Sequence, residues 1–182
     1  LELGERYPGD AGVLAAMLLN RISLVAGEGI YLPAGNLHAY LHGIGFEVMA
    51  NSDNVLRGGL TPKHVDVPEL LRVLDFTPTD GGPIHPRPAD DGVEEVFDTP
   101  APEFAVSILR IGEDRLGTAV EVPKGHAGPQ ILLGTQGRVQ VHSAGGELTL
   151  NKGAAVWIAA GEGPVRLVAD EPSTVFRGTV GI

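Results

Sequence analysis

Eight short runs of β-branched and other apolar residues lie between residues 104 and 180, and this pattern constrains the fold most. The runs are FAVSILRI, TAVEV, QILLGT, RVQVH, ELTL, AAVWIA, VRLVA and TVFRGTV. Tight-turn sequences such as SAGGE separate them. Many short strands joined by turns are typical of antiparallel sandwiches and barrels. We therefore predict a mainly β fold here.

The N-terminal part of the chain has a mixed pattern. Residues 9–20 predict a short helix with Asp10 as its cap and an apolar stripe at helical spacing. Residues 66–76 predict a second helix, because Asp66 and Glu69 have capping-box spacing. Three β-prone runs lie between them, separated by glycine-containing turns: RISLV, GIYL and GFEVMA. We expect one or two short helices beside strands.

Residues 77–103 hold six prolines and many acidic residues, with almost no apolar pattern. This composition predicts a linker or a long surface loop. The chain then divides into the end of a helical segment (1–20), a part with strands and a helix (21–76), the loop (77–103) and a second β domain (104–182).

Composition excludes several classes of function. A net charge of -10 disfavours nucleic-acid and anionic-membrane partners, because clustered Lys and Arg bind them. The absence of cysteine excludes disulfides and thiolate metal sites and fits a cytoplasmic protein. No apolar run approaches the roughly 20 residues of a membrane helix. Because the chain lacks an initiating Met, we interpret it as a fragment or processed form.

An internal repeat relates the two parts of the chain. GEGIYLPAGNLH at 27–38 aligns without gaps to GAAVWIAAGEGP at 153–164. Both copies place a glycine turn, a β-prone run and a second tight turn in the same order, which predicts two barrels built to one plan. His38 in the first copy corresponds to Pro164 in the second. The second barrel is therefore predicted to lack a metal site.

The first copy has the pattern Gly27-x5-Pro33-x-Gly35-x2-His38. This pattern resembles the second conserved motif of the cupins, small β-barrels (jelly rolls) that often hold a divalent metal at the barrel mouth. Imidazole at that position suits zinc, iron, nickel or manganese. The alternative reading is a hydrogen-bonded turn histidine. The predicted fold class is thus a cupin-like antiparallel barrel in a bicupin arrangement.

Arg57 follows the polar run NSDN and precedes Gly58 and Gly59. Glycine beside arginine lets a ligand approach the backbone, and a guanidinium gives bidentate hydrogen bonds to a phosphate or an oxyanion. Lys63 adds positive charge nearby and is predicted to bind substrate. The alternative makes Asp53 part of a turn, with Arg57 as its surface ion-pair partner.

Three segments, YLPAGNLHAYLHG, EVMANSDNVLRGGLTPKHVDV and ELLRVLDF, resemble the C-terminal half of type I mannose-6-phosphate isomerases (phosphomannose isomerases). The resemblance runs from about residue 10 to 76 and more loosely to the C-terminus. It implies a zinc-dependent aldose–ketose isomerase that interconverts mannose 6-phosphate and fructose 6-phosphate. On this resemblance 21–76 belong to the catalytic cupin barrel.

The resemblance also implies residue roles. His38 would be a zinc ligand, Arg57 a catalytic residue, and Glu47 and Asp53 acids that line the same pocket. Isomerisation between C1 and C2 passes through an enediol or enediolate, so a proton must move while negative charge grows on oxygen. A divalent cation and an arginine stabilise that charge, and a carboxylate, histidine or lysine moves the proton.

The chain departs from the family in its metal ligands. The family draws its other zinc ligands, a Gln-x-His pair and a Glu, from its N-terminal half. Gln140-Val141-His142 lacks the expected flanking sequence and follows His38, whereas the family's pair precedes it. We therefore predict an incomplete zinc site, and a chain that by itself binds little metal and is inactive.

Alternatives of other classes stay open at this point. One is a non-catalytic bicupin that binds sugars or mediates assembly, and another is a metal-dependent oxygenase, for which the sequence shows no iron triad. The expected partner is a small hexose phosphate, with neither nucleic acid nor membrane. If the N-terminal half of the family's fold is absent, the strands in 21–60 are expected to pair with a second chain or to pack on the C-terminal barrel.

Overall fold

The computed structural model describes residues 1–52, 55–79, 81–122 and 128–181. By their internal contacts the residues form two compact units, which are described separately. Unit 1 consists of Leu1–Val25, Ile30–Gly45 and Asn51–Pro83. Unit 2 consists of Ala26–Gly29, Phe46–Ala50 and Ile84–Ile182.

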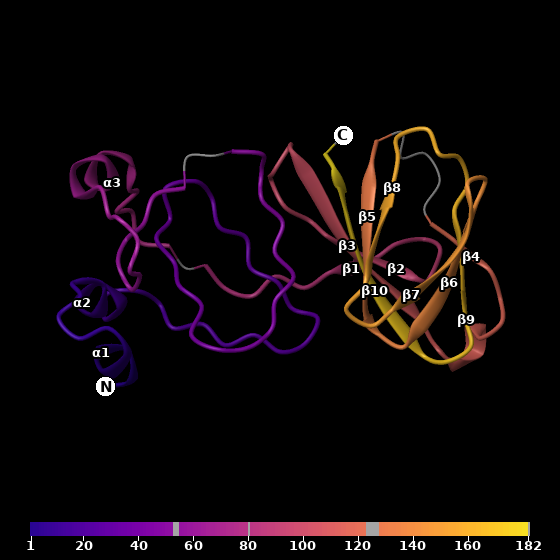
Figure 1. Cartoon of the computed structure of the whole chain (residues 1–182), viewed down its shortest axis with the longest axis horizontal. Coiled ribbons are helices and arrows are strands. Elements are labelled where there is room, and N and C mark those ends of the chain that lie inside the picture. The colour runs from indigo at the N-terminus through magenta and orange to yellow at the C-terminus, as the bar shows by residue number, and fades with distance from the viewer. Residues whose placement is uncertain (53–54, 80, 123–127, 182) are drawn as a thin grey trace. The chain divides into compact units, whose positions relative to one another are not determined.

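Unit 2 contains two antiparallel sheets (Figure 1). Its strands are β1 (Arg87–Pro88), β2 (Glu94–Phe97), β3 (Phe104–Ile111), β4 (Val120–Glu121), β5 (Gln130–Gln136), β6 (Arg138–Ser143), β7 (Gly146–Asn151), β8 (Ala155–Ile158), β9 (Arg166–Ala169) and β10 (Ser173–Val180), with a 3-10 turn, η1 (Glu113–Arg115), after β3. One sheet has the order β1-β2-β3-β10-β5-β8 and the other β4-β9-β6-β7. Each of the eight runs predicted after residue 103 contains a strand, which confirms the mainly β, antiparallel class.

The core of unit 2 follows from strand alternation. In β10 alternate residues from Ser173 to Thr179 are buried, because successive side chains of a strand point to opposite faces of the sheet. Side chains of both sheets form one apolar cluster: among its members Leu109, Leu132, Val139, Leu150, Leu167 and Val175 are at most 1% exposed. The two sheets stay separate and do not close into one barrel.

The predicted loop 77–103 is wrong for its second half, which contains β1 and β2. Asp91 Oδ1 accepts hydrogen bonds from the amides of Val93 and Glu94. These bonds form the turn from which β2 starts at Glu94. β2 pairs with β3 in the six-stranded sheet. The sequence hid this strand because Glu94, although charged, is buried with polar partners.

Unit 1 contains α1 (Glu2–Arg6), α2 (Gly12–Ala16) and α3 (Val67–Val73). The helix predicted over 9–20 is helical only in α2, and the N-cap of α2 is Ala11, so the prediction of Asp10 as its cap is wrong. The helix predicted over 66–76 is present as α3, and the amide of Glu69 donates to the capping carboxylate of Asp66 at 3.1 Å. None of the helices among the described residues has both the length and the apolar content to span a membrane.

The three strands predicted between residues 21 and 50 are not formed. Among the described residues of 21–66, β pairing is limited to one isolated bridge, between Gly29 and Ile84. A strand needs a neighbour that accepts and donates its backbone hydrogen bonds, and apart from that one bridge these runs have none among the described residues. Several of their apolar side chains are exposed: Leu24, Val25 and Met49.

Candidate active site

Residues 57–60, the arginine turn, hold Arg57, which is the predicted catalytic arginine. Gly59 (φ +121°) and Leu60 (φ +54°) both adopt a positive φ. Arg57 is half-buried. Within the described part of the chain its guanidinium has no hydrogen-bond or ion-pair partner. Its donors are therefore available to a ligand.

The two glycines of the arginine turn admit neighbouring atoms of unit 1. A Cβ at Gly58 would overlap Cδ1 of Leu37, the residue before His38. A Cβ at Gly59 would lie 2.7 Å from Asp10 Oδ1 and 2.8 Å from Gly12 Cα. The structure thus gives these glycines a packing role, whereas the sequence suggested that they clear space for a ligand.

Asp10 joins the N-terminal part of unit 1 to the arginine turn. Its Oδ1 accepts a hydrogen bond from the Gly12 amide at 2.7 Å, and its Oδ2 accepts one from the Leu60 amide at 2.9 Å. The hydrogen bond from Gly12, and then that from Leu60, lowers the pKa of Asp10 below its ordinary value of 3.8. The carboxylate form is therefore favoured.

His38 follows the turn at Pro33–Gly35 and is exposed. Its Nδ1 lies 3.1 Å from the carbonyl oxygen of Asn36, and its ring meets Tyr40 edge-on at a centroid distance of 5.9 Å. A carbonyl can only accept, so this contact selects the tautomer of the neutral ring in which Nδ1 carries the proton and Nε2 has the lone pair. That arrangement is the one expected of a metal-ligating histidine.

The arginine turn and the His38 segment are in contact, since Gly58 packs against Leu37. The amide of Asp75, just after α3, donates to the Gly35 carbonyl at 3.0 Å and holds the turn before His38. Unit 1 therefore brings together the segments of two predicted site residues. Sequence reasoning missed Leu37 and the second contact of Asp10, because neither residue belongs to a motif that reports a contact so distant in sequence.

The other predicted site residues are less constrained. Lys63 is exposed, and its amide donates to Thr61 Oγ1 at 3.2 Å. Glu47 is exposed and belongs to unit 2, where Phe46 contacts Phe176 at a ring distance of 5.1 Å. Asp53 lies outside the described residues. A shared pocket for these three residues stays a prediction.

Gln140 and His142 are not arranged as a metal pair. Gln140 Oε1 accepts a hydrogen bond from Thr149 Oγ1 at 2.9 Å, and His142 Nδ1 lies 3.0 Å from Glu147 Oε1. No group of three possible metal-ligating side chains exists among the described residues. Catalytic zinc usually has three protein ligands, so the described residues do not by themselves fit a zinc ion.

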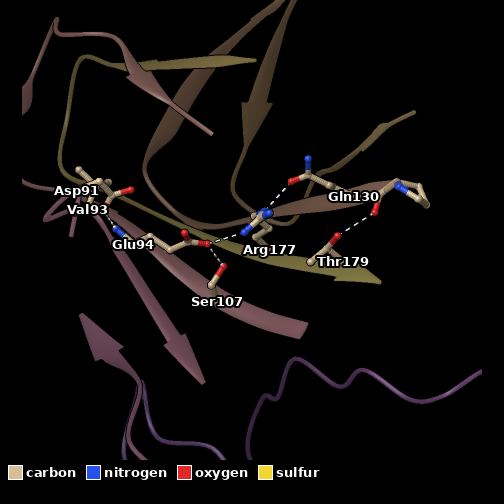
Figure 2. A network of polar contacts seen from close by, with 8 residues as sticks. Asp91, Val93, Glu94, Ser107, Gln130, Arg177 and Thr179 are labelled. Atoms are coloured by element: carbon tan, nitrogen blue, oxygen red, sulfur yellow. Dashed lines mark hydrogen bonds and ion pairs between the residues drawn. The ribbon is translucent and has the colours of Figure 1, made fainter. Parts of the chain in front are cut away.

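A buried polar network occupies the interior of unit 2 (Figure 2). Arg177 Nη1 donates to Glu94 Oε1 at 2.6 Å, Arg177 Nε donates to Gln130 Oε1 at 2.5 Å, and Ser107 donates to Glu94. Arg177 and Glu94 are each 5% exposed. Within the described residues every buried side-chain polar atom has a partner, so this network stabilises the sandwich and leaves no group over for a ligand.

Comparison with known proteins gives a consistent set of relatives. No family model matches the chain. It is 38% identical over 163 residues to the mannose-6-phosphate isomerase of Salmonella typhimurium, covering 90% of this chain. It is 36% identical over 183 residues to that of Mus musculus, covering 97% of this chain. The chain spans about 40% of the length of the curated relatives that it matches.

Solved structures agree with these relatives. The Salmonella typhimurium mannose 6-phosphate isomerase bound to fructose 6-phosphate and zinc has a TM-score of 0.81 and 33% sequence identity. The match covers 98% of this chain and 44% of that one. The antiparallel sheets thus belong to a protein of the cupin fold. The chain is a homologue of the mannose-6-phosphate isomerases and matches a C-terminal portion of them.

Proposed function

We propose that the chain is part of a zinc-dependent aldose–ketose isomerase that interconverts mannose 6-phosphate and fructose 6-phosphate. The relatives carry the name of this activity, and one solved relative binds fructose 6-phosphate and zinc. The observation that carries the proposal is the packing of the arginine turn against the His38 segment through Gly58 and Leu37. Arg57, the predicted catalytic residue, and His38, the predicted metal ligand, therefore lie in segments of unit 1 that are in contact.

Arg57 suits the charge that develops in this reaction. Negative charge grows on the O1 and O2 oxygens of the enediolate, and a guanidinium provides several N–H donors with a charge that persists at any working pH. Its donors have no partner among the described residues. Glu47 and Asp53 are proposed as acids of the same site, and Lys63 is proposed to bind the substrate phosphate.

His38 would supply one zinc ligand through Nε2, and the other ligands have to come from outside the described residues. When bound, zinc would supply further stabilisation of oxyanion charge. The chain by itself is therefore expected to bind little zinc and to be inactive. A cytoplasmic location and assembly through unpaired backbone stay predictions.

The test uses a chimera: the Salmonella typhimurium enzyme with this chain in place of the segment that it matches. We expect the chimera to isomerise mannose 6-phosphate, and Arg57→Ala to lower kcat about a hundredfold or more. Arg72→Ala is the matched control, because Arg72 is an exposed arginine of unit 1 that pairs with Glu69.

Arg72→Ala should leave kcat unchanged. A folded, zinc-loaded chimera without isomerase turnover would contradict the proposal. Wild-type turnover in the Arg57→Ala chimera would leave the proposed reaction standing but would contradict a catalytic role for Arg57.

A further inference from the structure

The backbone of the arginine turn is held in a conformation that few side chains accept. Leu60, with φ +54°, is the one non-glycine residue with positive φ among the described residues. Such a conformation is unfavourable for a residue with a bulky side chain, and it persists only where the surrounding structure holds it. A contact within unit 1 must therefore stabilise the backbone conformation of Leu60.

Asp10 makes that contact. Its two carboxylate oxygens accept hydrogen bonds from two different parts of unit 1, the Gly12 amide at 2.7 Å and the Leu60 amide at 2.9 Å. Leu60 is 50 residues from Asp10 in the sequence. Asp10 is not the N-cap of α2, which is Ala11. A residue that served only the local turn before α2 would have no need of the second hydrogen bond.

The backbones that Asp10 joins are in direct contact. A Cβ at Gly12 would lie 3.1 Å from Gly59 Cα, and a Cβ at Gly59 would lie 2.8 Å from Gly12 Cα. Only glycine at both positions allows this approach. The arginine turn is therefore held from one side by Asp10 and Gly12.

The other side of the arginine turn is held by Leu37, which occupies the place that a Cβ on Gly58 would take. Arg57 precedes Gly58 directly, and His38 follows Leu37 directly. The Asp10 contact and the Leu37 contact together fix Arg57 relative to the His38 segment.

We propose that Asp10 is a positioning residue, which holds the arginine turn so that the Arg57 guanidinium meets the reacting oxygens of the substrate. This role rests on the isomerase function proposed above. Asp10 does not touch the substrate, and it acts through the backbone of Leu60.

Three variants separate this role from a purely local one, the hydrogen bond from the Gly12 amide. Asp10→Ser keeps an oxygen that can accept from the Gly12 amide two residues on, but its shorter side chain has only that oxygen and cannot bond both amides. Asp10→Asn keeps the shape and loses one acceptor oxygen. Asp66→Asn is the matched control, because Asp66 accepts a hydrogen bond from the Glu69 amide in the same unit and, among the described residues, makes no hydrogen bond to the arginine turn.

The first measurement is hydrogen exchange of the Leu60 amide in this chain. Asp10→Ser should speed that exchange about ten- to hundredfold, because a hydrogen bond to a charged acceptor is lost, and Asp66→Asn should not change it. The second is steady-state kinetics in the chimera. Asp10→Ser should lower kcat about tenfold or more at nearly unchanged KM, and Asp66→Asn should leave both unchanged.

Unchanged Leu60 exchange in Asp10→Ser would overturn the contact. Faster exchange with unchanged kcat would overturn the positioning role. A chimera that lacks turnover with Asp10 intact would overturn the proposed function and with it the role in positioning, although the exchange rates would still report the Asp10 contact.

Discussion

The two copies of the repeat, 27–38 and 153–164, share their turn geometry but differ in the backbone pairing of the segment between the turns. The first glycine has φ +95° in one copy and +82° in the other, and the later glycine has +84° and +77°. The Asn36 amide donates to Pro33 at 3.3 Å, and the Glu162 amide donates to Ala159 at 3.2 Å. The local sequence, through the spacing of its glycines, is therefore sufficient to determine the turn geometry.

The segment between the turns depends on its neighbours. In the second copy it is β8, which pairs with β5 over four residues and places Ile158 in the core. In the first copy it forms one bridge, from Gly29 to Ile84. Glycine spacing therefore specifies a turn without help from distant residues, whereas a strand forms only where a partner strand is available.

The largest expected effect tests whether unit 2 depends on its interior polar network. Arg177→Met should cost about 3–5 kcal/mol of unfolding free energy, because it leaves Glu94 buried without its ion partner. Arg110→Met is the control, since Arg110 pairs with Glu95 at a partly exposed site, and it should cost less than about 1 kcal/mol. Urea denaturation measures both.

A double variant, Arg177→Met with Glu94→Leu, should recover most of that loss, because an apolar pair replaces a buried ion pair of similar volume. If Arg177→Met proved as stable as the unchanged chain, the network would have no part in holding the sandwich together.

The next effect concerns the strand beside β8. Leu132 of β5 is fully buried, and Leu132→Ala should cost about 2–5 kcal/mol. Leu41 lies in the region without strands and is 46% exposed. Leu41→Ala should change the unfolding free energy by less than about 0.5 kcal/mol. Equal losses in thermal or urea unfolding would break the contrast between the two regions.

A smaller effect compares the equivalent glycines. Gly161→Ala should cost about 1–2 kcal/mol in urea unfolding, from the left-handed backbone alone, because nothing lies within 4 Å of its Cβ position. Gly35→Ala adds a clash, with Val73 O at 2.9 Å. It should also speed exchange of the Asp75 amide, which donates to Gly35. Unchanged Asp75 exchange would contradict this packing.

The smallest effect is a pH dependence in unit 1. Because hydrogen bonds lower the pKa of Asp10 below 3.8, its stabilisation of the Leu60 amide is fully present above that value and is lost as the pH falls through the lowered pKa. The Leu60 amide chemical shift should therefore be constant from neutral pH to about pH 4 and change only below it. In Asp10→Asn this change should be absent.

Particular residues show what the sequence could predict. Val175 and Leu109 lie in short β-prone runs bounded by turn residues, a local signal that needs no distant partner, so the eight strands are predictable from the sequence. The capping of α3 by Asp66 is a local contact, three residues apart, and is predictable for the same reason. β2 was missed because Glu94 is a buried acid whose partner, Arg177, lies 83 residues away.

The site was predictable in its chemistry and less so in its construction. The motif residues point to His38 and Arg57, and the family resemblance gives their roles. The contact of Asp10 with Leu60 joins residues far apart in the chain, so no local pattern reports it. The prediction of strands at 21–50 is wrong, because the pattern of β-prone residues shows strand propensity but not whether a neighbouring strand is present.

The proposed role of His38, which Pro164 replaces in the second copy of the repeat, is tested most directly by zinc binding. In the chimera, zinc content and isomerase turnover should be measured for His38→Ala beside His42→Ala, a nearby exposed histidine. His38→Ala should lose both zinc and turnover, whereas His42→Ala should keep one zinc per chain and most of its rate. A His38→Ala chimera that keeps both zinc and turnover would contradict the proposed role of His38.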